Sequence, residues 1–252
     1  MAFKLSEVDV AADFDKLMAC QWLAHEDPFQ PFYRLFCPVF ESGREASVKE
    51  STERLLAWHE HDPHARWLKV EESETGHIVG GAWYKIYAEN PFEHPEDEVA
   101  DWYPDDSSRD FVSQAIGQMD VPRMKKATRP QVCTYTAAGS PNTHSRLSDR
   151  RAVLNILFAH PHYRHKGIGS MLLQWGIDTA KELGIEFWLN ATPMGKPLYE
   201  KHGFEIVEEN PLKPTTTNPD ETWKAMEKQF EGVVFWTMWL PKEGGGARPW
   251  EQ

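Results

Sequence analysis

The residues best suited to chemistry lie in one short stretch in the second half of the chain. It reads Ala159-His160-Pro161-His162-Tyr163-Arg164-His165-Lys166-Gly167-Ile168-Gly169-Ser170. An apolar run at 153–159 predicts a buried strand before the turn, and the pattern of 169–183 predicts a helix after it. Free N–H groups and the dipole at a helix start attract an anion, and Gly167 and Gly169 would let the backbone approach it closely. Because Arg164 and Lys166 add positive charge, the stretch predicts a pyrophosphate site.

Other phosphate-binding motifs do not fit this stretch. The sequence has no G-x-x-x-x-G-K-[ST], which excludes a Walker loop. The third glycine of G-x-G-x-x-G is missing, and no acidic ribose ligand follows the next predicted strand. A glycine turn can also be only a turn, so its spacing alone leaves a phosphate site and a plain turn as alternatives.

Two motifs together resemble the GNAT superfamily of N-acetyltransferases. The segment 164–169 is similar to the family signature (Q/R)-x-x-G-x-(G/A), and it follows a predicted strand and a Pro-x-Tyr. The segment 198–204 is similar to the L-Y-x-K-x-G-F that ends the family's last core helix. The resemblance is clearest over 150–210 and extends more loosely to 67–87. Residues 1–60 and 90–150 also resemble fungal members.

The resemblance implies an α/β fold in which a mixed central sheet, flanked by helices, is splayed in a V around acetyl-CoA. We therefore expect a single domain at 1–240 with an insertion at about 90–150 and a flexible tail at 241–252. The implied activity is transfer of the acetyl group of acetyl-CoA to a primary amine of a small molecule or peptide, by direct attack.

The resemblance also implies roles for individual residues. The N–H of Ala159 would polarise the thioester carbonyl, and Tyr199 would protonate the departing CoA thiolate. The expected cofactor contacts are Phe158, Ala159, Arg164, His165, Lys166, Gly167, Ile168, Gly169, Ser170 and Asn190.

Two features depart from the family pattern. Many members carry an Asn seven residues before the tyrosine, where this chain has Thr192, and Asn190 lies two residues earlier. Some members carry a Glu base on the strand before the signature, whereas 153–159 contains no acid. A water chain, a histidine or a residue of the insertion remain the alternatives for the base.

Other functions stay open beside this one. The chain could use another acyl-CoA or an alcohol acceptor, or it could be a CoA-binding module that has lost catalysis. The retained Tyr199 favours an enzyme, and the absent strand carboxylate leaves room for the inactive module.

Composition limits the partners and the location. The net charge of -12 over 252 residues argues against binding to nucleic acid and to anionic membranes. The three cysteines show neither a disulfide framework nor zinc spacing, and the apolar runs are too short to cross a bilayer, so a cytoplasmic protein is expected. Homodimer formation is left open. Two H-x-H-x-x-H clusters, at 59–64 and 160–165, are interpreted as surface histidines rather than metal ligands.

The elements that must position these residues follow from periodicity. We expect helices at 8–25, 48–59, 107–119, 169–183 and 194–202, with a loop at 121–130. Expected strands are 67–72, 78–87, 153–159, 185–190, 204–208 and 233–240. Gly80 and Gly81 indicate a bulge or a close backbone approach. Trp83, Tyr84 and Tyr87 could line an acceptor pocket or belong to the core, and the acidic run 93–110 could attract a cation or simply face solvent.

Overall fold

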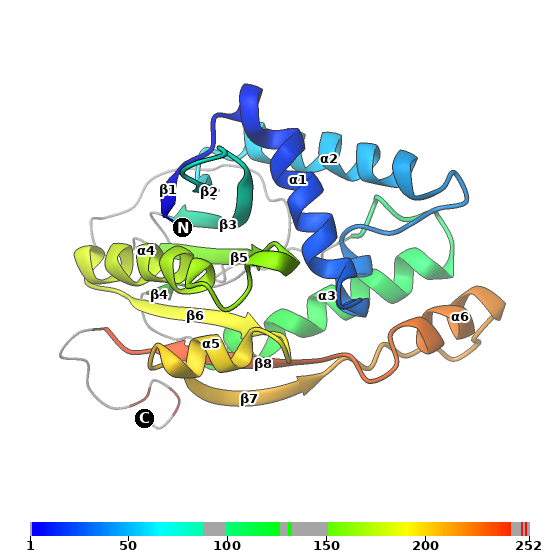
Figure 1. Ribbon diagram of the computed structural model, residues 1–252. Coiled ribbons are helices and arrows are strands. Elements are labelled where there is room, and N and C mark those ends of the chain that lie inside the picture. Colours follow the sequence, from blue (N-terminus) through cyan, green and yellow to red (C-terminus); the bar gives the residue numbers. More distant parts are fainter. Residues whose placement is uncertain are drawn as a thin grey trace.

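Two four-stranded sheets organise the chain (Figure 1). The computed structural model describes residues 2–87, 99–126, 131–132, 151–242, 248 and 250. The first sheet has the order β1-β2-β3-β5, and every neighbouring pair is antiparallel. Its strands are β1 (Phe3–Glu7), β2 (Ala65–Glu72), β3 (Ile78–Tyr87) and β5 (Arg151–Ala159).

The second sheet has the order β4-β6-β8-β7, with β4 parallel to β6 and the other pairs antiparallel. Its strands are β4 (Gln131–Val132), β6 (Glu186–Ala191), β7 (Glu205–Pro211) and β8 (Val234–Leu240). The strands β5 and β6 therefore belong to different sheets, although only the helix α4 (Ile168–Leu183) and its flanking turns separate them along the chain. This arrangement is the mixed α/β architecture that the sequence predicts. The division between the two sheets lies between β5 and β6.

The remaining helices lie on both sides of this division. They are α1 (Val10–Glu26), η1 (Pro31–Leu35), α2 (Arg44–His61), α3 (Ser107–Lys126), η2 (Pro161–Tyr163), α5 (Lys196–Lys201) and α6 (Glu221–Gln229). Figure 1 shows α1 and α2 together beside the first sheet, whereas α3 approaches the second sheet and α6 extends outward from it.

The helix α1 confirms its expected amphipathic pattern. The carboxylate of Asp9 accepts hydrogen bonds from the N–H groups of Ala11 and Ala12, at 3.1 and 3.3 Å, which caps the helix start. The expected apolar face is buried; it consists of Phe14, Leu17, Met18 and Trp22. Packing of this face against the first sheet fixes where the last turn of the helix ends.

The glycine pair of β3 marks a close approach between elements. The register of β2 and β3 shifts between Val70 and Glu71, so the expected irregularity lies beside the pair. A Cβ on Gly80 would lie 2.5 Å from Ile168 Cγ2 and 2.8 Å from the carbonyl oxygen of Phe158. A Cβ on Gly81 would lie 2.6 Å from Leu17 Cδ1. The two glycines thus let α1, β5 and the start of α4 pack directly on β3.

The expectation of a loop at 121–130 was wrong for 121–126, because α3 continues through Pro122 to Lys126. A proline inside a helix removes the N–H that would bond to the carbonyl four residues earlier, here that of Gln118. That carbonyl instead accepts a hydrogen bond of 2.7 Å from Asn210 Nδ2. A contact from a distant strand thus compensates for the proline, and local sequence could not reveal it.

The segment 99–126 shares a core with the rest of the chain. Residues of α3, including Phe111 and Ile116, form a buried cluster with Leu35, Trp223 and Phe235. The described part of the expected insertion is therefore packed on η1, α6 and β8. The remainder of the expected insertion, at 90–98, 127–130 and 133–150, lies outside the described residues, as does most of the expected tail. Sequence patterns also missed β1, η1 and α6.

We predict that Gly80→Ala destabilises the fold by roughly 1–3 kcal/mol, because a methyl group there overpacks a site bounded by the carbonyl of Phe158. Gly117→Ala is the matched control, since its added Cβ lies on α3 with nothing within 4 Å and should stabilise by up to ~1 kcal/mol. Urea unfolding followed by circular dichroism measures both. Equal stability of Gly80→Ala and the parent would contradict the packing described here.

Candidate active site

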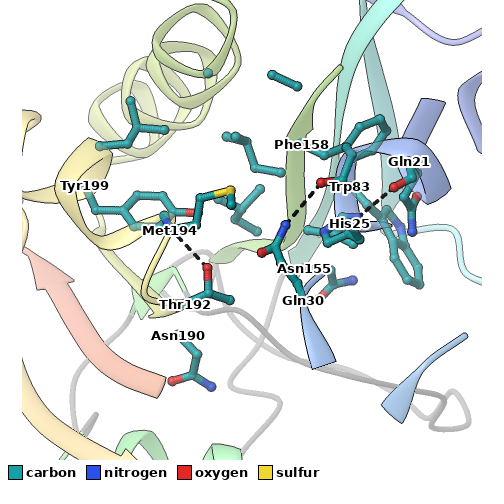
Figure 2. Close-up of a pocket in the computed structure, with 18 of the residues that line it drawn as sticks. Gln21, His25, Gln30, Trp83, Asn155, Phe158, Asn190, Thr192, Met194 and Tyr199 are labelled. Atoms are coloured by element: carbon teal, nitrogen blue, oxygen red, sulfur yellow. Dashed lines mark hydrogen bonds between the residues drawn. The ribbon is translucent and has the colours of Figure 1, made fainter. Parts of the chain in front are cut away.

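A cavity of about 780 Å³ opens where the two sheets separate. Its walls include the last six residues of β5 from the first sheet and Asn190 of β6 from the second. The start of α4, the helix α5 and the end of α1 contribute further lining residues. Figure 2 shows Tyr199 on one side of this cavity and His25 on the other, with Asn155 and Met194 between them.

The backbone of β5 presents one edge to the cavity. His160 donates its N–H to the carbonyl of Val79 in β3, at 2.9 Å. Successive N–H groups of an extended strand point to opposite edges. The N–H of Ala159 therefore points away from β3, toward the side on which β6 lies. This is the backbone group that the family resemblance implies would polarise the thioester carbonyl.

The turn after β5 brings the uncapped start of α4 to the cavity. His165 has a φ of 59° and Gly167 a φ of 87°, both in the left-handed region, and Gly167 is the N-cap of α4. A glycine has no side chain to cap the helix, so the first N–H groups of α4 keep their donors available. Gly167, Ile168, Gly169 and Ser170 all line the cavity. The predicted strand-turn-helix is confirmed, with α4 ending at Gly184 in a left-handed C-cap.

The two glycines of this turn serve different purposes. Gly167 is required by its positive φ, and a Cβ on it would meet nothing within 4 Å. A Cβ on Gly169 would lie 3.1 Å from Leu198 Cδ2, so this glycine allows α4 to pack against α5. Gly169 also lines the cavity, so its expected contact with a phosphate stays a prediction beside this packing role.

The two cations of the turn have other partners in this structure. Arg164 lines the cavity, and its Nη2 donates to the carbonyl of Ala24 near the end of α1, at 2.7 Å. Lys166 is not among the described lining residues, and its Nζ lies 4.5 Å from the ring centroid of Tyr163. Of the two, the structure brings only Arg164 to the cavity wall.

The other expected cofactor contacts occupy different parts of the wall. Phe158 is buried, His165 is exposed at the turn, and Ser170 Oγ lies 3.0 Å from His202 Nε2. The amide of Asn190 donates to the carbonyl of Met119 at 2.9 Å and accepts from Thr237 Oγ1 at 3.2 Å, which joins β6 to α3 and β8. Thr192, at the position where many GNAT members have Asn, accepts from the N–H of Gly195 at 3.1 Å.

Tyr199 is a buried phenol in the cavity wall. Only 7% of the residue is exposed, and its ring packs edge-on against Phe204 with centroids 5.8 Å apart. Burial raises the pKa of Tyr199 well above its usual range near 10. The phenol therefore stays protonated at neutral pH and can act as a proton donor.

His25 is a buried titratable residue of the cavity wall that sequence patterns did not identify. It lies on the last turn of α1, is 4% exposed and stacks on Tyr33 with ring centroids 4.2 Å apart. Its Nδ1 lies 2.7 Å from the carbonyl oxygen of Gln21. A carbonyl only accepts, so Nδ1 must carry the proton in the neutral ring, and Nε2 keeps its lone pair. His25 lies far in sequence from 159–170, so no local pattern linked it to that stretch.

The environment of His25 favours the neutral imidazole. Burial lowers the pKa of His25 to about 4, and the positive charges of Arg164 and Arg34 act in the same direction. The hydrogen bond to Gln21 opposes this shift without cancelling it. At neutral pH the imidazole is therefore uncharged, and the lone pair of Nε2 can accept a hydrogen bond.

One buried ion pair completes the polar lining. Asp120 and Arg123 of α3 both line the cavity, and Arg123 Nη2 pairs with Asp120 Oδ1. Their side chains are 5% and 0% exposed, respectively. The opposite charges compensate one another within the wall.

Within the described residues, no group of three or more His, Cys, Asp or Glu side chains is arranged to hold a metal ion. In the 59–64 cluster, His61 Nδ1 contacts the carbonyl of Ala57 and His64 Nδ1 contacts that of Ile86, at 2.7 and 2.9 Å. Among the described helices, none combines the length and apolarity needed to cross a bilayer.

We predict that His25 makes stability depend on pH between about 6.5 and 4. The unfolded histidine binds a proton below pH ~6.5, whereas the folded one resists protonation until about pH 4. Stability should therefore be fully present above pH ~6.5 and fall by roughly 1–3 kcal/mol as pH drops through this window. His25→Asn should remove that part of the loss, and His77→Gln, in the exposed β2–β3 turn, should not. Identical pH profiles for the parent and His25→Asn, from urea unfolding, would refute the assignment.

Comparison with known proteins agrees with this architecture. Residues 132–206 match the model of the acetyltransferase (GNAT) domain. A protein named acetyltransferase from the fungus Stachybotrys chartarum is 24% identical over 108 residues, which cover 42% of this chain and 46% of that protein. The match thus spans less than half of that relative.

Solved structures share the fold over nearly the whole chain. A mutant agmatine N-acetyltransferase has a TM-score of 0.58 at 14% identity, covering 94% of this chain and 98% of its own. The Drosophila melanogaster polyamine N-acetyltransferase has a TM-score of 0.57 at 16% identity, with coverage of 95% and 99%. A Corynebacterium glutamicum protein described as histone acetyltransferase HPA2 and related acetyltransferase has a TM-score of 0.53 at 16% identity, with coverage of 96% and 98%. Residues 132–206 thus match the acetyltransferase (GNAT) domain, and the chain shares its fold with these solved acetyltransferase structures.

Proposed function

We propose that the chain transfers the acetyl group of acetyl-CoA to a primary amine. The observation that carries this proposal is one continuous cavity that joins the uncapped start of α4 to a buried phenol and a neutral imidazole. Agmatine and polyamine N-acetyltransferases share the fold, which agrees with an amine acceptor.

The residues present fit a CoA thioester. The N–H groups at the start of α4, from Ile168 to Ser170, would hold the pyrophosphate, and the left-handed Gly167 keeps this helix end uncapped. The outward edge of β5 would pair with the extended pantetheine arm, and the N–H of Ala159 would donate to the carbonyl of the acetyl group. When bound, acetyl-CoA would supply an acetyl group activated as a thioester.

The proton transfers are assigned to two side chains on opposite walls. His25 would accept the proton that the amine loses as its nitrogen forms the new C–N bond, because the lone pair of Nε2 is kept free by the bond from Nδ1 to Gln21. Tyr199 would donate its phenolic proton to the sulfur as the C–S bond breaks. The sequence left the base open among three alternatives, and this assignment chooses the histidine.

The alternatives are less well supported. Another acyl-CoA would need the same pyrophosphate site, so the choice of acyl group depends on the room beside Ala159. An inactive CoA-binding module has no need for a proton donor and a proton acceptor in one cavity. The presence of both Tyr199 and His25 in the wall favours an enzyme.

We predict that Ser170→Asp weakens acetyl-CoA binding without weakening the fold. Ser170 lies in the first turn of α4, where a carboxylate stabilises a helix but repels a phosphate group. We expect Kd, measured by isothermal calorimetry, to rise about 10-fold or more, the effect of about 1.4 kcal/mol of lost interaction. Ser170→Asn, which adds no charge, is the control and should bind close to the parent level. Unchanged affinity of Ser170→Asp would remove the pyrophosphate from this helix end.

We predict that Tyr199→Phe lowers kcat about 10²- to 10⁴-fold, because it keeps the ring packing on Phe204 and removes only the proton donor. The Kd for acetyl-CoA and the Tm should stay near the parent values. A CoA analogue with a better leaving thiolate should narrow the difference in kcat between the parent and Tyr199→Phe. This result distinguishes loss of the proton donor from distortion of the site. The companion variant His25→Asn keeps a donor for Gln21, and it should lower kcat without changing the response to that analogue. Parent-like turnover of Tyr199→Phe, with chemistry rate-limiting, would show that Tyr199 is only structural.

A further inference from the structure

One carboxylate in the described cavity wall uses only one of its two oxygens. Asp120 of α3 lines the cavity and is 3% exposed. Its Oδ1 pairs with Nη2 of Arg123, whereas Oδ2 is buried and meets no hydrogen-bond partner among the described residues. A buried carboxylate oxygen without a donor is costly. Because Asp120 belongs to a cavity wall, a bound ligand can supply that donor.

The unpaired oxygen of Asp120 differs from the other unpaired groups of the wall in its charge. The side-chain oxygen of Gln21 and the indole N–H groups of Trp67 and Trp83 also line the cavity and are buried without a hydrogen-bond partner. These three groups are neutral, and an uncharged polar ligand can satisfy them. A carboxylate makes its strongest hydrogen bonds with a donor that is itself charged.

The charges of the wall leave one place for a cationic group. The other charged residues of the described lining are the cations Arg123, Arg164 and Lys201, and the acidic residues described at 101–110 are not part of the lining. The guanidinium of Arg123 favours the ionised form of its neighbour Asp120. An ammonium group that enters the described part of the cavity is therefore compensated at Asp120 Oδ2.

We infer that Asp120 binds the acceptor nitrogen through Oδ2 and thereby favours an ammonium over an uncharged acceptor of the same shape. This inference rests on the proposed acetyl transfer, and it assigns a specificity-determining residue to that same cavity. The ammonium loses one proton to solvent before its lone pair attacks the thioester carbon. A remaining N–H keeps the hydrogen bond to Oδ2, which orients the nitrogen. An alcohol offers Oδ2 only one neutral donor, so the assignment also favours an amine over the alcohol acceptor left open by the sequence.

The test uses two acceptors of equal length, butylamine and O-propylhydroxylamine, with CoA release above the enzyme-free rate as the readout. Both present a primary nitrogen, but at neutral pH butylamine is an ammonium and O-propylhydroxylamine is uncharged. In the parent we expect a KM for butylamine about 10-fold or more below that for O-propylhydroxylamine, the scale of a charge-assisted hydrogen bond. An equal or higher KM for butylamine overturns the inference and leaves the proposed acetyl transfer standing. CoA release with neither probe counts against both.

Variants of Asp120 locate the effect. Asp120→Asn should lower the ratio of kcat/KM for butylamine to that for O-propylhydroxylamine about 10-fold or more, mainly by raising KM for butylamine. The Kd for acetyl-CoA should stay near the parent value. Because this variant leaves the buried charge of Arg123 uncompensated, its Tm should fall. The double variant Asp120→Asn/Arg123→Gln removes both charges and should lose the preference as well.

Asp110→Asn is the matched control, since Asp110 lies exposed on the same helix and is not a lining residue. It should keep the parent ratio. An unchanged ratio in either Asp120 variant overturns the assignment whether or not the Tm has fallen, because the ratio compares two acceptors on the same folded enzyme.

Discussion

The separation of β5 from β6 is the constraint on which the rest of the structure depends. In the described residues, β5 lies at the edge of its sheet beside β3, whereas β6 pairs with β8 over Phe187–Ala191 and with the short β4 at Glu186 and Phe187. Backbone groups at the edge of a sheet need partners, and a cavity wall is where an extended ligand can supply them. The helix α4 then has to cross from one sheet to the other, which brings its start to the mouth of the same gap.

The packing of α4 shows how rigidly this start is held. The hydroxyl of Tyr84 donates to the carbonyl of Leu172 at 3.0 Å, and a Cβ on Gly176 would lie 2.7 Å from the same tyrosine. This settles part of the uncertainty left by the aromatic strand: Tyr84 belongs to the core, whereas Trp83, on the opposite face, lines the cavity. The side chain of Tyr87 is outside the described part of the chain. Strand alternation alone could not say which face was which.

The features that were predicted correctly from sequence are those that depend on neighbouring residues. The caps at Asp9 and Gly184 and the glycine turn before α4 depend on residues close in sequence, and all three were predictable. The places of Asp120 and His25 in the cavity could not be predicted. Both depend on elements that lie more than a hundred residues apart in the sequence and come together only in the fold. The length of α3 was missed for the same reason, since Asn210 supplies what Pro122 removes.

The partners of the charged side chains in the turn before α4 were the hardest feature to predict from sequence. A cation in a turn bonds to whichever acceptor the fold brings near, and for Arg164 this is the carbonyl of Ala24 at the end of α1. That carbonyl immediately precedes His25, whose pKa is itself lowered by Arg164. One guanidinium therefore ties the turn proposed to bind pyrophosphate to the helix end that carries the proposed base. This contact positions one side of the cavity relative to the other. The geometry between the proposed proton donor and the proposed proton acceptor therefore depends on the end of α1 as much as on α4.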